Sequence, residues 1–129
     1  MLDGTNPFVR FRNVQKSYDG ETLVVKNLNL DIEAGEFVTM LGPSGSGKTT
    51  CLMMLAGFET ATHGEIELGG RPINNIPPHK RGIGMVFQNY ALFPHMTVAE
   101  NLSFPLKVRN MAAGDIQDKV MRALSLIHI

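Results

Sequence analysis

The chain has 129 residues, with twelve basic and twelve acidic side chains and a formal net charge of zero. Because a neutral chain lacks the electropositive footprint that binds a phosphate backbone, we expect no nucleic-acid partner. A hydrophobic share of 43% and a charged share of 19% are those of an ordinary globular domain, or part of one. We find no signal peptide, and no apolar run approaches the roughly 18 residues of a membrane span. The single cysteine, Cys51, is expected to be a buried thiol in a reducing compartment, which favours a cytoplasmic protein.

The first predicted elements are two strands. Apolar and charged residues alternate over 9–12, and apolar and polar residues alternate again over 27–33, which is the period of a strand buried on one face. Two such strands so close in the sequence predict an antiparallel pair. The residues over 33–36 are typical of a turn.

A third strand is predicted over Phe37–Leu41, where nearly continuous apolar residues are typical of a central strand buried on both faces. A deeply buried helix is predicted over Lys48–Ala56, since its residues are apolar on almost every side. Gly57 suits the C-terminal end of that helix. Between the strand and the helix lies the loop LGPSGSGKTT of residues 41–50.

This loop matches a phosphate-binding pattern. Gly42–Thr49 fits G-x-x-x-x-G-K-[S/T], in the strand–loop–helix context that the motif requires. Glycines let backbone N–H groups approach phosphate oxygens, and the positive end of the helix dipole points at the same anion. We expect Lys48 to neutralise the β- and γ-phosphates, and Thr49 to place its hydroxyl on Mg²⁺. The alternative is a glycine-rich connector with an exposed lysine, but a connector has no need of this spacing.

Two further strands are predicted along the chain. Glutamates alternate with Ile66 and Leu68, which indicates a half-exposed strand leading into a turn at Gly69-Gly70. The apolar run Ile83–Phe87 predicts another buried strand, which ends at Gln88. Ligand-binding groups in α/β sheets lie at such C-terminal strand ends.

Two helices are predicted in the last third of the chain. Thr97 and Glu100 match a capping box, and the helix that they begin should stop or kink near Pro105. The second helix covers 115–127, with Asp115 as its cap. Its apolar face is formed by Ile116, Val120, Leu124 and Ile127.

With the loop in place, the sequence resembles the ATP-binding subunit of ABC transporters. GPSGSGKTT followed by MLAGFETATHGEI is similar to the family's phosphate loop and the segment after it. RGIGMVFQNYALFPHMTVAENLSFPL is similar to its Q-loop region and the start of its helical subdomain. The resemblance covers about residues 8–125. In detail it is greatest to importers of the polyamine, maltose and iron type, with NNIPPHKRGIGMVFQNYALFPHMTVAEN most similar to the polyamine branch.

The resemblance implies an α/β P-loop NTPase fold of the ABC type, in which an antiparallel β layer precedes a mostly parallel core. Residues 8–96 would form the β layer and the phosphate-loop core, and 97–129 would begin the helical subdomain. The implied activity is ATP hydrolysis with Mg²⁺, energising import of a solute such as spermidine or putrescine. Two rivals stay open: a nucleotide-binding module that does not hydrolyse, and another P-loop enzyme such as a kinase or GTPase.

The resemblance also implies roles for single residues. Tyr18 would stack on adenine, the alternative being an ordinary tyrosine at a strand end. Gln88 would contact Mg²⁺ and the attacking water and share the catalytic role with Lys48, the alternative being a solvated loop glutamine. Thr49 would be a second metal contact. The nucleotide's phosphates would be held by Gly42, Pro43, Ser44, Gly45, Ser46, Gly47, Lys48, Thr49 and Thr50.

The implied partners are other subunits of a transporter. The loop 89–94 would meet transmembrane permease subunits, with Phe93 either in that contact or packed locally. A second copy of the ATPase subunit would complete a homodimer, and a solute-binding protein would act indirectly. The protein would then lie at the inner face of the cell membrane through its partners.

Three parts of the family's pattern do not occur in this sequence: the LSGGQ signature, the apolar strand that ends in Asp-Glu, and the switch histidine. We therefore expect the N-terminal part of a nucleotide-binding domain, which lacks its general base and is inactive in hydrolysis by itself. Residues 125–129 resemble the family least and could be foreign to it.

Overall fold

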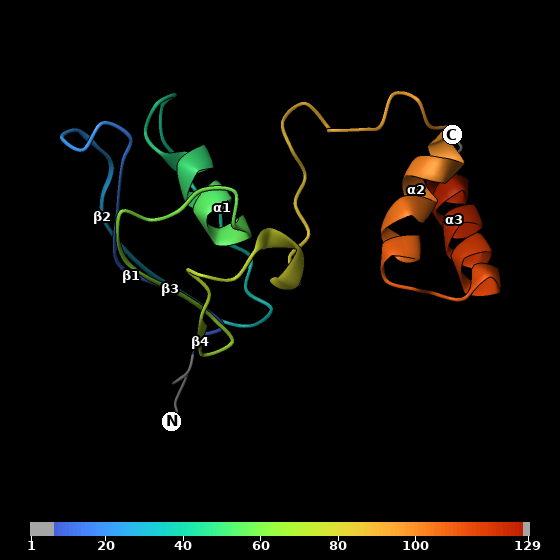
Figure 1. Cartoon of the computed structure of the whole chain (residues 1–129), viewed down its shortest axis with the longest axis horizontal. Coiled ribbons are helices and arrows are strands. Elements are labelled where there is room, and N and C mark those ends of the chain that lie inside the picture. The colour runs from blue at the N-terminus through green and yellow to red at the C-terminus, as the bar shows by residue number, and fades with distance from the viewer. Residues whose placement is uncertain (1–6, 128–129) are drawn as a thin grey trace. The chain divides into compact units, whose positions relative to one another are not determined.

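The computed structural model describes residues 7–127. The chain divides between Met85 and Val86 into two compact units. The first unit holds a sheet, one α-helix and a 3-10 turn at Pro78–Lys80, and the second holds two α-helices (Figure 1). Of the helices that the structure describes, none is long and apolar enough to cross a membrane.

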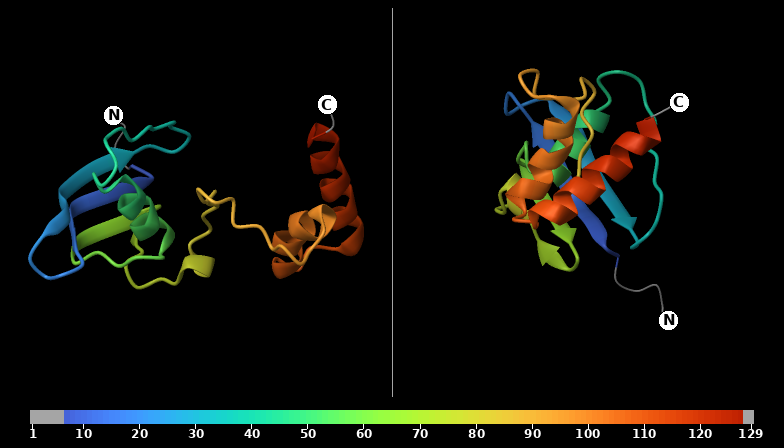
Figure 2. Two further views of the ribbon diagram at one scale, coloured as in Figure 1. Left: turned by 90° about the horizontal axis from the view of Figure 1, so that it is seen from above. Right: turned by 90° about the vertical axis from the view of Figure 1, so that its right-hand side faces the viewer.

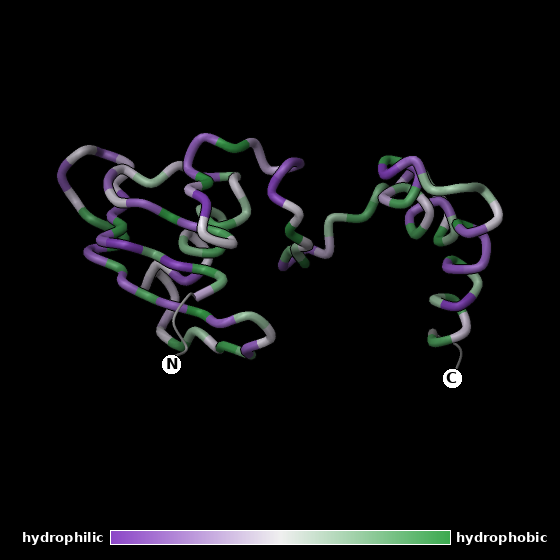
Figure 3. The backbone as a smooth tube through the Cα atoms, turned by 90° about the horizontal axis from the view of Figure 1, so that it is seen from below, coloured by the Kyte–Doolittle hydropathy of each residue, from purple (hydrophilic) through white to green (hydrophobic). Residues whose placement is uncertain are grey.

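The sheet of the first unit is antiparallel throughout, with the strand order β2-β1-β3-β4. Hydrophilic and hydrophobic residues alternate along its strands, as expected where one face is buried (Figure 3). Phe11 in β1 pairs with Leu30 in β2 on one side and with Ile66 in β3 on the other. The predicted antiparallel pair and the turn at Gly69-Gly70 are confirmed. The strands are β1 (Val9–Ser17), β2 (Leu23–Ile32), β3 (His63–Leu68) and β4 (Arg71–Pro72).

The helix α1 (Lys48–Ala56) covers one face of this sheet (Figure 2). Its side chains Cys51 and Met54 are buried in one core with Phe11, Val14 and other strand residues. The predicted helix, its end at Gly57 and the buried thiol are confirmed. The expectation that α1 is deeply buried is wrong on one side, because Leu52 is 49% exposed.

The second unit contains α2 (Val98–Val108) and α3 (Ala113–Ile127), packed as a helical hairpin. The predicted capping box is confirmed: the Glu100 N–H donates to Thr97 Oγ1 at 3.1 Å, and the Thr97 N–H donates to Glu100 Oε1 at 2.8 Å. Ser103 and Val120 are buried in the groove between the helices. On the predicted apolar face, Ile116, Val120 and Leu124 are buried or half-buried, and the Ile127 side chain lies outside the described residues.

α2 does not stop at Pro105, since it continues to Val108 and the Arg109 N–H closes the last turn on the Pro105 carbonyl at 3.3 Å. A proline removes its own N–H donor but leaves its carbonyl able to accept. The alternative expectation, a kink near Pro105, stays a prediction. Asp115 is not the cap of α3, because the helix begins two residues earlier, although its carboxylate still lies in the first turn, where negative charge is favourable.

The two strands expected to form a parallel core are also absent. Phe37–Leu41 is extended but is not a strand, with Phe37 93% and Leu41 90% exposed. Ile83–Phe87 is likewise without strand structure, and it spans the boundary between the two units. Buried parallel strands need paired neighbours and helices on both faces. Among residues 7–127 no neighbouring strand pairs with either segment, so their apolar composition alone does not make them strands.

Candidate functional site

The loop before α1 is shaped by glycines in the left-handed region. Gly45 has φ +84° and Gly47 has φ +90°, a conformation that costs other residues free energy. Between them the Ser46 N–H donates to the Pro43 carbonyl at 3.1 Å, which closes a turn. A Cβ at Gly47 would lie only 3.0 Å from the Val24 carbonyl oxygen of β2. The glycine at this position therefore follows from both its backbone angle and its close approach to the sheet.

The N-terminal end of α1 is open. Gly47 is its N-cap, no side chain caps it, and no acidic residue lies in its first turn. The Cys51 N–H donates to the Gly47 carbonyl at 3.0 Å. Within the described residues, nothing accepts a hydrogen bond from the backbone N–H groups of Lys48, Thr49 and Thr50. These unpaired donors and the positive end of the helix dipole together favour an anion at this place.

The Lys48 side chain folds back over the same loop. Its Nζ donates to the Gly42 carbonyl, and no carboxylate in the described part of the chain forms an ion pair with it. A Cβ at Gly42 would lie 2.6 Å from Ser46 Oγ, so the Ser46 hydroxyl would have to rotate away to make room for it. The ammonium charge is thus held beside the open helix end and is not neutralised there. This set of donors fits a phosphate group, which carries negative charge and accepts several hydrogen bonds.

Tyr18 and Thr50 are brought together across the first unit. The Tyr18 hydroxyl lies 3.5 Å from Thr50 Oγ1, at the long limit of a hydrogen bond. The Tyr18 ring is 60% exposed, and the Lys16 ammonium lies 4.9 Å from its centroid. Thr49, the expected metal contact, is exposed in the first turn of α1. An exposed aromatic ring next to the phosphate loop is the arrangement that stacking of a base requires.

The position of Tyr18 is fixed by its neighbour Asp19. One carboxylate oxygen of Asp19 accepts from the Glu21 N–H at 2.8 Å, the Thr22 N–H at 2.7 Å and the Ser17 hydroxyl at 3.0 Å. These bonds, above all those from the Glu21 and Thr22 N–H groups, lower the pKa of Asp19 from 3.8 to about 2. Our sequence analysis did not single out Asp19. The dipeptide Asp19-Gly20, which marks turns, was the signal that could have found it.

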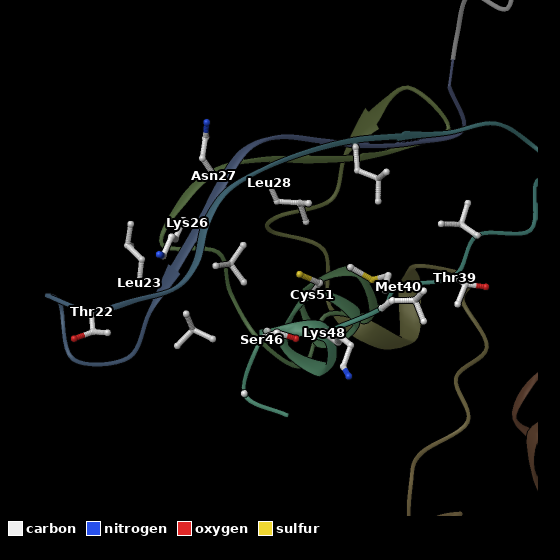
Figure 4. A pocket seen from close by; sticks show the side chains of 17 residues that line it. Thr22, Leu23, Lys26, Asn27, Leu28, Thr39, Met40, Ser46, Lys48 and Cys51 are labelled. Carbon is white, nitrogen blue, oxygen red and sulfur yellow. The ribbon is translucent and has the colours of Figure 1, made fainter. Parts of the chain in front are cut away.

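A pocket of about 750 Å³ lies between β2, the extended segment 38–41 and the start of α1 (Figure 4). The Leu28 side chain points toward α1 from β2, whereas Asn27 points away from it. Cys51 lies in the wall of this pocket, and burial raises the pKa of its thiol. A buried cysteine with a raised pKa is a poor nucleophile, so we assign Cys51 to the core.

Gln88 belongs to the second unit and is exposed. It lies in a turn that is closed by a hydrogen bond from the Tyr90 N–H to the Phe87 carbonyl at 3.0 Å. Tyr90 and Ala91 follow with φ of +66° and +52°, which are unusual for residues with a side chain. The strand expected over Ile83–Phe87 is absent, so no strand fixes the backbone before Gln88. The role of Gln88 in hydrolysis stays a prediction.

The loop 89–94 ends in a small aromatic cluster. The Phe93 ring lies 4.8 Å from that of Phe104 and 5.9 Å from that of His95, while Phe93 keeps 39% of its surface exposed. The Asn101 side chain pairs with both backbone groups of Phe93: its Oδ1 accepts from the N–H at 2.9 Å and its Nδ2 donates to the carbonyl at 3.2 Å. Phe93 is thus packed locally and also presents an exposed edge.

Known proteins resemble this chain closely in sequence. Over 123 residues it is 47% identical to the spermidine/putrescine import ATP-binding protein PotA of Vibrio vulnificus, covering 95% of this chain and 32% of that protein. The PotA of Thermotoga maritima is 50% identical over 121 residues, which are 94% of this chain and 33% of that protein. The sn-glycerol-3-phosphate import ATP-binding protein UgpC of Cupriavidus pinatubonensis is 48% identical over 118 residues, 92% of this chain and 32% of that protein. The chain spans about a third of the length of these curated relatives.

Solved structures show the same likeness. The dimeric ATP-binding cassette MJ0796 in a post-hydrolysis state bound to ADP and Pi superposes with a TM-score of 0.80 and 34% sequence identity, covering 91% of this chain and 56% of that one. A second dimeric structure of MJ0796, a bacterial ABC transporter cassette, gives a TM-score of 0.78 and 36% identity, covering 91% of this chain and 54% of that one. The family described as ABC transporter matches residues 25–129, and this chain therefore belongs to it.

Proposed function

We propose that this chain binds Mg·ATP through Gly42–Thr50 and Tyr18, and that the full-length protein hydrolyses ATP to drive solute transport. One observation carries the proposal: three unpaired N–H groups at the start of α1 lie beside the unneutralised Lys48 ammonium. A single anionic group can accept hydrogen bonds from these N–H groups and also neutralise the Lys48 ammonium. The membership in the ABC transporter family and the ADP and Pi named for a solved relative support the identity of that anion as a nucleotide phosphate.

The reaction is attack of water on the γ-phosphate, in which catalysis consists largely of positioning and charge stabilisation. The backbone N–H groups and Lys48 hold the phosphates and offset their charge. Thr49 would hold Mg²⁺ through its exposed hydroxyl, and a bound Mg²⁺ neutralises charge on the phosphoryl oxygens. Gln88 is proposed to contact the metal and to orient the attacking water.

For the transported solute, we propose a small charged metabolite, and polyamines are the first candidates. The polyamine-importer relatives match at 47–50% identity and the glycerol-3-phosphate-importer relatives at 48%, so both classes are compatible with the chain. The solute would be chosen by permease and solute-binding subunits. The permease would contact the loop 89–94, where Phe93 presents its exposed edge. The dimers described for MJ0796 support pairing with a second ATPase subunit. The pair would lie at the inner face of the membrane through its contact with the permease.

The proposal is tested by nucleotide binding and phosphate release. Isothermal titration of the full-length protein with Mg·ATP and with Mg·GTP should show preference for ATP, and the same protein with its permease should release phosphate. Equal affinity for GTP would favour the kinase or GTPase alternative. Tight ATP binding without phosphate release, in the presence of the permease, would favour a nucleotide-binding module that does not hydrolyse.

A further inference from the structure

Arg81 is a buried cation that pairs with backbone carbonyls. Only 8% of the residue is exposed. Its Nε donates to the Ile76 carbonyl at 2.8 Å, and its Nη1 donates to the carbonyls of Met54 at 2.8 Å and Leu55 at 3.0 Å. No carboxylate within residues 7–127 forms an ion pair with it. The guanidinium therefore binds main-chain carbonyls, two in α1 and one at Ile76, and no other side chain in the described part of the chain.

These bonds satisfy the C-terminal end of α1. The last carbonyls of a helix have no partner inside the helix. The Met53 carbonyl is satisfied by the N–H groups that follow the helix, those of Gly57 and Phe58, both at 2.9 Å. The next two carbonyls, of Met54 and Leu55, are the ones that Arg81 takes. Arg81 thus pairs with two carbonyls of the last turn of α1 that the N–H groups after the helix do not reach.

The absence of a side chain at Gly57 makes this contact possible. Gly57 has φ +97°, and a Cβ there would lie 2.9 Å from Arg81 Nε and 3.1 Å from Pro78 Cα. The guanidinium therefore lies directly against the backbone at the end of the helix. Gly57 and Arg81 together join the end of α1 to the turn at Pro78–Lys80.

A buried cation is a costly way to stabilise a fold. Desolvation lowers the pKa of Arg81, and a buried charge is unfavourable unless several hydrogen bonds compensate for it. Even buried ion pairs can often be replaced by apolar residues of similar volume without loss of stability. The guanidinium makes two contributions that an apolar residue cannot make. Its hydrogen bonds fix the position of the helix end, and its positive charge lies at the negative end of the helix dipole.

We infer that Arg81 is a positioning residue of the phosphate-binding site, acting through α1. The inference rests on the proposed function. α1 has nine residues, so its two ends are about 13 Å apart. Arg81 holds the C-terminal end of α1, and the phosphate-binding N–H groups and Lys48 lie at the N-terminal end. A helix of this length moves as a rigid rod, so an anchor at one end fixes the direction of the N–H groups at the other.

The test compares Arg81→Lys with Lys80→Ala in the full-length protein. Lysine keeps the charge but cannot reach three carbonyls in fixed directions, whereas Lys80 is an exposed neighbour with no side-chain partner in the described structure. We expect Arg81→Lys to raise the Kd for Mg·ATP on the order of tenfold, which is the loss expected when a hydrogen bond to a charged phosphate is weakened. Lys80→Ala should leave the Kd unchanged. Both are measured well below the unfolding midpoint, so that only folded protein is compared.

The outcomes separate this inference from the proposed function. If the wild-type protein does not bind Mg·ATP, the proposed function is wrong. If the wild type binds, Lys48→Ala weakens binding and Arg81→Lys lowers the unfolding midpoint without changing the Kd, Arg81 has only a structural role and the inference is overturned.

If Arg81→Lys does not fold, the inference is tested by hydrogen–deuterium exchange of the wild-type protein, measured with and without Mg·ATP. We expect nucleotide to slow exchange at the Gly57 and Phe58 amides, at the far end of α1, as well as in the loop 43–51. Slower exchange confined to the loop would show that the two ends of α1 are not coupled, and would overturn the inference.

Discussion

The Tyr18 hydroxyl lies 3.5 Å from Thr50 Oγ1, so the loop between β1 and β2 meets the first turn of α1. Two segments that are 32 residues apart in the sequence thus border the same site. One offers an exposed aromatic ring, and the other offers the unpaired N–H groups and Lys48. A nucleotide needs both kinds of surface, because its base stacks while its phosphates require donors and positive charge.

The Tyr18 ring, and not its hydroxyl, should carry nucleotide affinity. Stacking of a base on an aromatic side chain contributes about 1–3 kcal/mol, so Tyr18→Ala should raise the Kd for Mg·ATP about fivefold or more. Tyr18→Phe loses only the long contact to Thr50 and should bind almost as tightly as the wild type. Titration of both variants measures this. Equal Kd values for Tyr18→Ala and the wild type would make Tyr18 an ordinary tyrosine at the end of a strand.

Gly47 should tolerate a side chain less well than Gly45. Both have positive φ, which costs an alanine about 1–2 kcal/mol. A Cβ at Gly45 meets no atom within 4 Å, whereas one at Gly47 lies 3.0 Å from the Val24 carbonyl oxygen. Gly47→Ala should therefore lower the free energy of unfolding by more than Gly45→Ala does, as measured by denaturant titration. Equal losses would mean that Gly47 does not press against β2.

Asp19 should make the stability of the Tyr18 loop depend on pH. Because its folded pKa is lowered from 3.8 to about 2, the ionised carboxylate stabilises the folded state above pH 3.8. This contribution is lost as the pH falls from 3.8 toward 2. Asp19→Asn should flatten the pH dependence of unfolding in that range, whereas Asp115→Asn, on an exposed helix turn, serves as the control. An unchanged acid transition in Asp19→Asn would contradict the assignment.

Gln88→Ala should separate binding from hydrolysis. In the proposed site Lys48 and the backbone N–H groups hold the phosphates, so the Kd for Mg·ATP should change little. The rate of phosphate release, and its stimulation by the permease, should fall because the residue proposed to orient water is lost. Asn75→Ala, an exposed turn residue outside the loop 89–94, is the control. If neither the rate nor the stimulation changes, Gln88 is a solvated loop residue. If Gln88→Ala abolishes binding while Lys48→Ala does not, the roles proposed for these residues are reversed.

The parts of the fold that depend on nearby residues could be predicted from the sequence. The capping box of Thr97 and Glu100, the helix Lys48–Ala56 and its glycine end each follow from a few neighbouring residues. The antiparallel pair of β1 and β2 follows from alternation and short separation. The loop Gly42–Thr50 could be singled out as a candidate phosphate site because its glycines, lysine and threonine lie within one short stretch.

The parts that depend on distant partners could not be predicted in this way. Phe37–Leu41 and Ile83–Phe87 have the composition of buried strands, but a strand exists only where neighbours pair with it. A stop near Pro105 was one of two outcomes that we predicted, because the missing N–H of proline was considered without the turn that Arg109 closes. Arg81 gave no signal, since its carbonyl partners on α1 lie 26 and 27 residues away in the sequence.

Equilibrium binding of Mg·ATP to the wild type and to Lys48→Ala tests the central claim most directly, with Lys80→Ala as the control for loss of a positive charge. Removing the Lys48 charge beside the open end of α1 should weaken binding about tenfold or more, since a hydrogen bond to a charged group contributes about 1.5–3 kcal/mol. Lys80→Ala should bind as the wild type does. If Lys48→Ala binds Mg·ATP with wild-type affinity, the loop Gly42–Thr50 is not the phosphate site, and the function proposed for this chain is wrong.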